Sequence, residues 1–224
     1  MSYQAVMFDL DGTLADTLTD LVEAGNDLRA AFGHEPLPAE TYRYLVGHGA
    51  PFLARRALDL AENDPRLDAA TQHFRTHLLE HGHKHTKPYP GIAEMLDALV
   101  SRGVKLAVLS NKPHDPTVDV VQRVFADWPF VDVRGHRPEA PPKPEPTVAL
   151  EIAALTGIAP EHWCFVGDSG VDMQTGVNSG ICPIGVTWGF REVAELREGG
   201  ARHLIDEPGQ LLELLDSAPQ PEAT

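Results

Sequence analysis

The chain has 224 residues, 42% of them hydrophobic, which is enough for one large domain or for a core domain with a smaller insertion. Its formal net charge of −15, from 18 basic and 33 acidic residues, argues against nucleic acid or an anionic membrane as the main partner. No window approaches the length of an apolar membrane span, and the two cysteines, Cys164 and Cys182, each lie in an apolar stretch. We therefore expect a cytoplasmic protein, a monomer or homodimer, without a disulfide framework.

The first predicted strand, AVMFDL (5–10), runs into two acids, Asp9 and Asp11, with one leucine between them. In an extended segment residues i and i+2 point to the same side, so the two carboxylates would lie close together. Like charges placed in this way repel each other, and the arrangement needs a metal ion, a shared proton or both. A calcium-binding EF-hand loop is excluded, because Leu14 stands where such a loop needs glycine and Asp20 where it needs glutamate.

The long segment that follows predicts helices and no convincing strand. Helical periodicity is present over 17–33, 51–63 and 68–82. A single crossover between two strands does not need so much chain. We therefore predict an inserted α-helical cap domain over 15–86, with TKPYPG (86–91) as its return hinge.

Beyond the insertion, short apolar strands alternate with amphipathic helices. Strands are predicted at 104–110, 162–167 and 181–188, with weaker candidates at 130–135 and 203–206. Helices are predicted at 91–103, 145–157 and 171–180. This alternation is typical of an α/β fold with a doubly wound, Rossmann-like parallel sheet, in which ligands bind at the carboxyl ends of the strands. We predict this core domain over 1–14 and 87–216, and a frayed tail over 217–224.

Polar side chains lie at four places along the chain, three at or just after a predicted strand end and one in the proline-rich loop before a helix. The carboxyl ends of parallel strands lie at one edge of a sheet. The side chains are those of Asp9 and Asp11, Ser110 and Asn111, Lys143, and Asp168 with Ser169 and Asp172. Carboxylate oxygens suit Mg²⁺, a carboxylate can attack phosphorus, and a second acid can transfer protons. A hydroxyl and an ammonium group can hold the other phosphoryl oxygens. Each residue alone has an ordinary structural explanation, such as a turn or a helix cap, but the combination predicts phosphate chemistry.

In this order DLDGT (9–13), Ser110, Lys143 and GDSGVD (167–172) resemble the four motifs of the haloacid dehalogenase superfamily, in particular its phosphatases with a helical cap. Four longer stretches are most similar to the phosphoglycolate phosphatases of that superfamily. They are VGHGAPFLARRAL (46–58), LSNKP (109–113), GIAPEHWCFVGDS (157–169) and GICPIGVTWGF (180–190). The resemblance implies a Mg²⁺-dependent phosphatase acting on a small phosphorylated metabolite, with 2-phosphoglycolate as the expected substrate.

The resemblance also implies roles for individual residues. Asp9 would be the nucleophile that forms an aspartyl-phosphate, and Asp11 the general acid and base, a group that a dehalogenase lacks. Mg²⁺ would be held by the Asp9 side chain, the Asp11 carbonyl and Asp168. Asp172 and Ser169 would orient these ligands, or Asp172 would reach the ion through water. The phosphoryl group would be bound by Ser110, Asn111 and Lys143.

Substrate selectivity is expected from the cap, where VGHGAP (46–51) is the best candidate for a loop that faces the core. His48 lies in this loop, and Arg55 or Arg56, one turn further, can pair with a substrate carboxylate. The alternative for both arginines is an exposed helix face. A series of histidines favours a solvated, pH-responsive helix face over a metal site, at His73, His77, His81, His83 and His85.

Other functions stay open at this point. A phosphosugar mutase, a pyrophosphatase or a nucleotidase can share the same core. From a different class, a phosphate-binding regulatory protein without activity is possible, but loss of Asp9 or Asp11 would be expected to mark it, and both acids are present.

Overall fold

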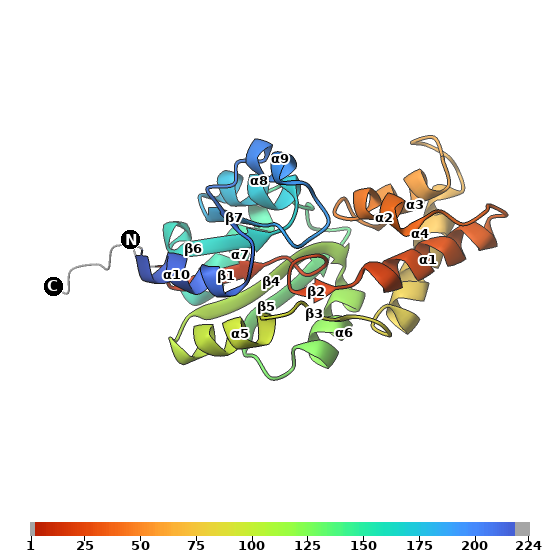
Figure 1. Cartoon of the computed structure of the whole chain (residues 1–224). Helices are drawn as coiled ribbons and strands as arrows, with labels where there is room; N and C mark the ends of the chain where they lie inside the picture. The colour runs from red at the N-terminus through yellow and green to blue at the C-terminus, as the bar shows by residue number, and fades with distance from the viewer. Residues whose placement is uncertain (1–2, 218–224) are drawn as a thin grey trace.

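A six-stranded parallel sheet forms the core of the computed structural model, which describes residues 3–217 (Figure 1). Its order is β5–β4–β1–β6–β7–β8, with β1 between β4 and β6. The strands are β1 (Ala5–Phe8), β4 (Lys105–Pro113), β5 (Phe130–His136), β6 (Trp163–Gly167), β7 (Cys182–Val186) and β8 (His203–Ile205). The predicted doubly wound sheet is confirmed, including its two weaker strands. The predicted frayed tail, apart from Ser217, lies outside the described residues.

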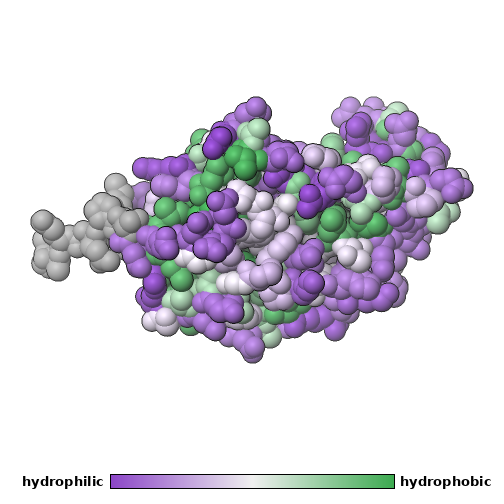
Figure 2. Space-filling model, in the orientation of Figure 1, coloured by the Kyte–Doolittle hydropathy of each residue, from purple (hydrophilic) through white to green (hydrophobic). Residues whose placement is uncertain are grey.

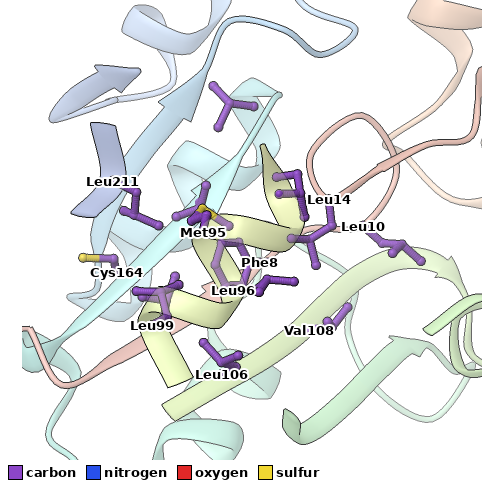
Figure 3. Packing of buried hydrophobic residues seen from close by; sticks show 14 of the residues in the cluster. Phe8, Leu10, Leu14, Met95, Leu96, Leu99, Leu106, Val108, Cys164 and Leu211 are labelled. Atoms are coloured by element: carbon purple, nitrogen blue, oxygen red, sulfur yellow. The ribbon is translucent and has the colours of Figure 1, made fainter. Parts of the chain in front are cut away.

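Helices cover both faces of the sheet, which explains why β1 is apolar at every position. Val6 and Phe8 point to one side and belong to the cluster that Figure 3 shows around α5. Ala5 and Met7 point to the other side and belong to a cluster with α7. The helices of the core are α5 (Ile92–Ser101), α6 (His114–Val124), α7 (Thr147–Thr156), α8 (Gly170–Ser179), α9 (Val193–Glu198) and α10 (Gly209–Ser217), with a short 3₁₀ turn η1 (Pro160–His162) before β6.

The inserted segment forms a separate group of helices beside the carboxyl edge of the sheet (Figure 1). Between residues 15 and 88, all of which the structure describes, these helices are α1 (Leu18–Ala31), α2 (Ala39–Leu45), α3 (Ala50–Ala57) and α4 (Leu67–His81). They share their own buried cluster, which includes Leu28, Tyr42 and Phe74. The chain leaves and returns through a short antiparallel pair, β2 (Ala15–Asp16) with β3 (Lys87–Pro88). We propose that this pair marks the boundary between the cap domain and the core domain.

The third cap helix is shorter than the periodicity over 51–63 predicts. It ends at Ala57 because Asp59 has a positive φ of 52°. The N–H of Leu60 then donates to the carbonyl of Arg55 at 2.9 Å, which closes the end of the helix with a left-handed turn. Aspartate is one of the few residues other than glycine that adopt this conformation readily.

No helix within residues 3–217 is long and apolar enough to cross a membrane. Figure 2 shows a largely hydrophilic face on which hydrophobic atoms form small separate groups. Among the described residues, the exposed large apolar side chains are spread over six elements, for example Tyr44 of α2, Leu79 of α4 and Leu155 of α7. Scattered residues of this kind are normal on a protein surface and need no partner to explain them.

Candidate active site

The carboxyl ends of β1, β4 and β6 bring the predicted acids and cations together. The N–H of Asp9 donates to the Val166 carbonyl at 2.9 Å, so the pairing of β1 with β6 continues up to the first acid. Ser110 lies near the end of β4, and Asp168 directly follows β6. All the side chains assigned here from the core motifs are buried: Asp9, Asp11, Ser110, Asn111, Lys143, Asp168, Ser169 and Asp172.

The Lys143 ammonium group connects the acids. Its Nζ lies 2.8 Å from Oδ1 of Asp9, 2.6 Å from Oδ1 of Asp172 and 3.0 Å from the carbonyl oxygen of Leu109. Burial opposes the charged form, but the carboxylates of Asp172 and Asp9 outweigh it and raise the pKa of Lys143 above its ordinary value. Lys143 is therefore a fixed positive charge in the middle of the acidic cluster.

Asn111 holds the Lys143 loop in place and also reaches the cap. Its Oδ1 accepts the N–H of Lys143 at 2.9 Å, and its Nδ2 donates to the Lys143 carbonyl at 3.0 Å. The same Nδ2 donates to the carbonyl of Gly47 at 2.9 Å. The predicted core-facing segment at 46–51 thus contacts the core through Gly47, and its last two residues, Ala50 and Pro51, already belong to α3. The neighbouring Ser110 uses its Oγ to accept the N–H of Lys112 at 3.3 Å.

Asp172 is oriented by the first turn of α8. Ser169 is the N-cap of this helix, and a capping box joins the two residues. Oδ2 of Asp172 accepts the N–H of Ser169 at 3.0 Å and its hydroxyl at 2.6 Å. This leaves Oδ1 for Lys143. The predicted orienting pair therefore meets, and Ser169 acts on Asp172 directly.

Asp168 is held by a backbone N–H group of the loop that follows β7. Its Oδ2 accepts the N–H of Phe190 at 2.6 Å. Gly12, with φ of 84°, lies so close that a Cβ there would be 2.3 Å from the same oxygen. The glycine that follows the second acid is needed both for its left-handed backbone and for this close approach.

Three carboxylates form a group that fits a divalent cation. One oxygen each from Asp9, Asp168 and Asp172 lie within 4.8 Å of one another. Burial, opposed by Lys143 but reinforced by the charge of Asp172, raises the pKa of Asp9 to about 6. Burial and the charge of Asp172 also raise the pKa of Asp168 well above its ordinary value. Buried oxygen donors with uncompensated negative charge are the environment that suits Mg²⁺.

Lys112 was not predicted as a site residue, yet it pairs with the second acid. Its Nζ lies 3.0 and 3.3 Å from the two carboxylate oxygens of Asp11, and its side chain is only 1% exposed. The sequence offers one signal for Lys112, which is its distance of two positions from Ser110, because residues 110 and 112 point to the same side of an extended strand. The Asp11 side chain thus lies outside the group of carboxylates formed by Asp9, Asp168 and Asp172. Metal binding by the Asp11 carbonyl stays a prediction.

A small cavity of about 30 Å³ separates this pair from the cap. Asp11, Asn111 and Lys112 line it on the core side. Its cap wall is largely apolar, formed by Leu21, Leu45, Val46, Leu53, Phe74 and Leu78 together with backbone of the 46–51 loop. A larger cavity of about 480 Å³ lies beside Ser110 and Lys143 at the end of β5, but Asp9, Asp11 and Asp168 do not line it. The small cavity is therefore the space nearest to the second acid.

The two cap residues predicted for specificity do not line this small cavity. His48 packs against the ring of Phe52, with ring centroids 4.7 Å apart, and Arg55 lies over the same ring at 5.7 Å. Burial and the nearby charge of Arg191 lower the pKa of His48. Within residues 3–217 no hydrogen bond or ion pair joins His48 or Arg55 to the acids of the site, although the charge of Asp172 acts on His48. Their role in substrate binding stays a prediction.

The histidine-rich helix α4 faces α1. His73 and His77 lie 2.7 and 3.1 Å from Oδ2 of Asp27. Within residues 3–217, the clusters of three or more potential ligands that are compact enough for a metal do not include a histidine of α4. His85 does belong to one such cluster, with Asp20 and Glu23, where Asp20 is already bonded to the backbone of the return segment.

The chain is similar to known hydrolases and phosphatases. A family model described as haloacid dehalogenase-like hydrolase matches residues 6–186. Phosphoglycolate phosphatase 1 of Pseudomonas aeruginosa is 32% identical over 217 residues, covering 95% of this chain and 80% of that protein. N-acetylmuramic acid 6-phosphate phosphatase of the same species is 32% identical over 221 residues, covering 97% of each. A solved structure from Lactobacillus delbrueckii subsp. bulgaricus, whose assignment as a phosphoglycolate phosphatase is itself a prediction, has a TM-score of 0.88 at 30% identity, covering 96% of this chain and 99% of that one.

The charge of the carboxylate group predicts how Mg²⁺ affects stability. Because the pKa of Asp9 is raised to about 6 in the folded state, the ion-free protein loses stability as pH rises from the ordinary carboxyl pKa toward 6. A bound cation offsets this loss, so Mg²⁺ should raise Tm more at pH 7.5 than at pH 5. Thermal unfolding with Mg²⁺ and with EDTA at both pH values measures the effect.

The variant Asp168→Asn provides the control for this prediction. It keeps an acceptor for the Phe190 N–H but removes one buried negative charge. At pH 7.5 it should unfold at a higher temperature than the ion-free wild type and should respond little to Mg²⁺. An equal Mg²⁺ response in both proteins would contradict the assignment of these carboxylates to a cation site.

Proposed function

The chain belongs to the haloacid dehalogenase-like hydrolase family and is a phosphoric monoester hydrolase, and we propose that it hydrolyses 2-phosphoglycolate to glycolate and phosphate in a Mg²⁺-dependent reaction. The observation that carries the chemistry is the buried contact of Lys143 with both Asp9 and Asp172, next to Asp168. It joins a nucleophile, a fixed cation and a cation-binding group at one sheet edge. These are the components that phosphoryl transfer needs.

In the proposed reaction the Asp9 carboxylate attacks the phosphorus atom. A bond forms between an Asp9 oxygen and phosphorus, and the ester P–O bond breaks as Asp11 gives a proton to the leaving oxygen. Asp11 then takes a proton from the water that attacks the aspartyl-phosphate, which releases phosphate and restores Asp9. Ser110 and Lys143 bind the non-bridging oxygens of the phosphoryl group, which keep their bonds to phosphorus throughout the transfer. When bound by Asp9, Asp168 and the Asp11 carbonyl, with Asp172 close by, Mg²⁺ supplies charge neutralisation for the phosphoryl group.

The choice of substrate is supported by the relatives and by the small cavity beside Asp11. At about 30 Å³ the cavity holds neither leaving group as it stands, but glycolate needs much less added space than the amino sugar of N-acetylmuramic acid 6-phosphate. Among the described residues that line this cavity, Lys112 is the only cation. We propose that its ammonium group recognises the carboxylate of the substrate.

We propose a cytoplasmic location, in line with two cysteines that are both buried and unbridged. The expectation of a monomer or homodimer stays a prediction.

A panel of phosphate esters tests the proposed function. With Mg²⁺ we expect 2-phosphoglycolate to have the highest kcat/KM among substrates that include N-acetylmuramic acid 6-phosphate, a hexose phosphate and p-nitrophenyl phosphate. Because Asp9 carries the covalent step, Asp9→Asn should lower kcat by about three orders of magnitude or more, and EDTA should also abolish turnover. If another ester is better by about tenfold, the substrate is wrong but the chemistry holds. An active Asp9→Asn variant would refute the chemistry itself.

The proposed role of Lys112 is tested with a pair of matched esters. For Lys112→Met, kcat/KM should fall by about tenfold or more further for 2-phosphoglycolate than for 2-hydroxyethyl phosphate, which has no carboxylate, because one charged contact is lost only with the former. Loss of the Asp11 contact affects both esters and cancels in the ratio. Lys112→Arg should recover part of the preference. An unchanged ratio would mean that Lys112 only positions Asp11.

A further inference from the structure

Two adjacent residues that follow β7 contact both the cation-binding group and the cap. Phe190 donates its N–H to Oδ2 of Asp168 at 2.6 Å. Phe190 is only 5% exposed and belongs to the buried cluster of the cap helices, although it is itself a residue of the core domain. Gly189, just before it, lies so close to Asp168 that a Cβ there would be 2.2 Å from the Cβ of the acid. This loop therefore rests directly on a proposed metal ligand.

Arg191 binds the end of a cap helix. Its guanidinium group donates to the carbonyls of Arg43, Tyr44 and Val46, the last at 2.6 Å, and so covers the C-terminal end of α2. The final carbonyls of a helix have no partner within the helix and carry partial negative charge, which makes a guanidinium group a suitable ligand for them. Arg191 also lies 5.5 Å from the ring of Tyr44 and pairs with Glu195 at 3.3 Å.

The cavity beneath the cap shows that these contacts belong to a closed arrangement. A volume of about 30 Å³ accommodates about two water molecules, which is less than a phosphate ester needs. The cap must therefore move away from the core when substrate enters. Because α2 is tied to the core through Arg191, this movement has to break or displace the Arg191 contacts.

We propose that Phe190 and Arg191, here called the strap, couple cation binding at Asp168 to closure of the cap. In the closed arrangement the Phe190 N–H fixes the orientation of the Asp168 carboxylate, and a ligand held in place in this way binds a cation more tightly than a mobile one. Coupling is reciprocal, so a bound cation favours the closed cap by the same factor. This inference rests on the proposed assignment of Asp168 to the cation site.

Mg²⁺ binding to the 224-residue chain, measured by calorimetry without substrate, tests the strap. Arg191→Met should bind Mg²⁺ about fivefold or more weakly than the wild type, whereas Arg56→Met, which removes an exposed arginine of α3, should bind it equally well. The direction of the change in Mg²⁺ affinity is informative, because loss of the Arg191 charge alone would change the affinity in the opposite direction. Arg191 is a positive charge that acts on the Asp168 carboxylate, so its removal without coupling would tighten the binding of a cation.

A second variant and a second measurement keep the test decisive. Arg191→Lys retains the charge but not the planar group that reaches three carbonyls, so weaker Mg²⁺ binding by this variant reports geometry alone. Mg²⁺ should also slow tryptic cleavage after Arg43 in the wild type, but not in either Arg191 variant. Equal Mg²⁺ affinity and equal protection in wild type and variants would refute the strap. If the wild type itself bound no Mg²⁺, the proposed cation site would fail, and the strap with it.

Discussion

The rest of the active site depends on the buried ion pairs that the Lys143 ammonium group makes with Asp9 and Asp172. A parallel sheet brings the ends of β1 and β6 together, and both strands end on acids. Carboxylates crowded there without a cation would repel one another and would be costly to bury. Lys143 contacts one acid from each side of this junction, Asp9 and Asp172, and is itself held in place by Asn111. The proline-rich loop that carries Lys143 is thus part of the charge balance of the sheet edge.

The same principle extends to the second acid and to the substrate. Asp11 has its own ammonium partner in Lys112, but the two lysines do not match the four buried carboxylates at this edge, Asp9, Asp11, Asp168 and Asp172. The remaining negative charge is what a divalent cation would balance. A chain with a formal net charge of −15 attracts an anionic substrate only where cations are concentrated locally. The proposed chemistry and the electrostatics of the fold therefore require the same ion.

Much of this arrangement could be predicted from the sequence because it depends on local patterns. The apolar strands, the acids that follow them and the order of the motifs are all visible in short windows. The short helix α2 was missed because its seven residues bury only Tyr42 and Leu45, too few for a periodic signal. The end of α3 depends on the backbone conformation of Asp59, which hydrophobic periodicity does not reveal.

The residues that connect distant segments could not be predicted in this way. Lys112 meets an acid 101 positions away, and Arg191 meets the Val46 carbonyl 145 positions away. Nothing in the immediate neighbourhood of either residue indicates its partner, because the Lys112 contact forms only when β1 and β4 pair within the core, and the Arg191 contact forms only when the cap packs on the core. Long-range contacts of this kind are also where substrate selectivity and cap movement are expected to be controlled.

The most direct measurement is the site of phosphorylation during turnover. Asp11→Asn should still accept a phosphoryl group from p-nitrophenyl phosphate, whose leaving group needs no proton, but should release it slowly because no base activates water. Acid quenching followed by tandem mass spectrometry of the N-terminal peptide locates the group. We expect one phosphoryl group, on Asp9. A phosphoryl group on another residue, or hydrolysis of this ester by the wild type with no labelled Asp9 in either protein, would contradict it.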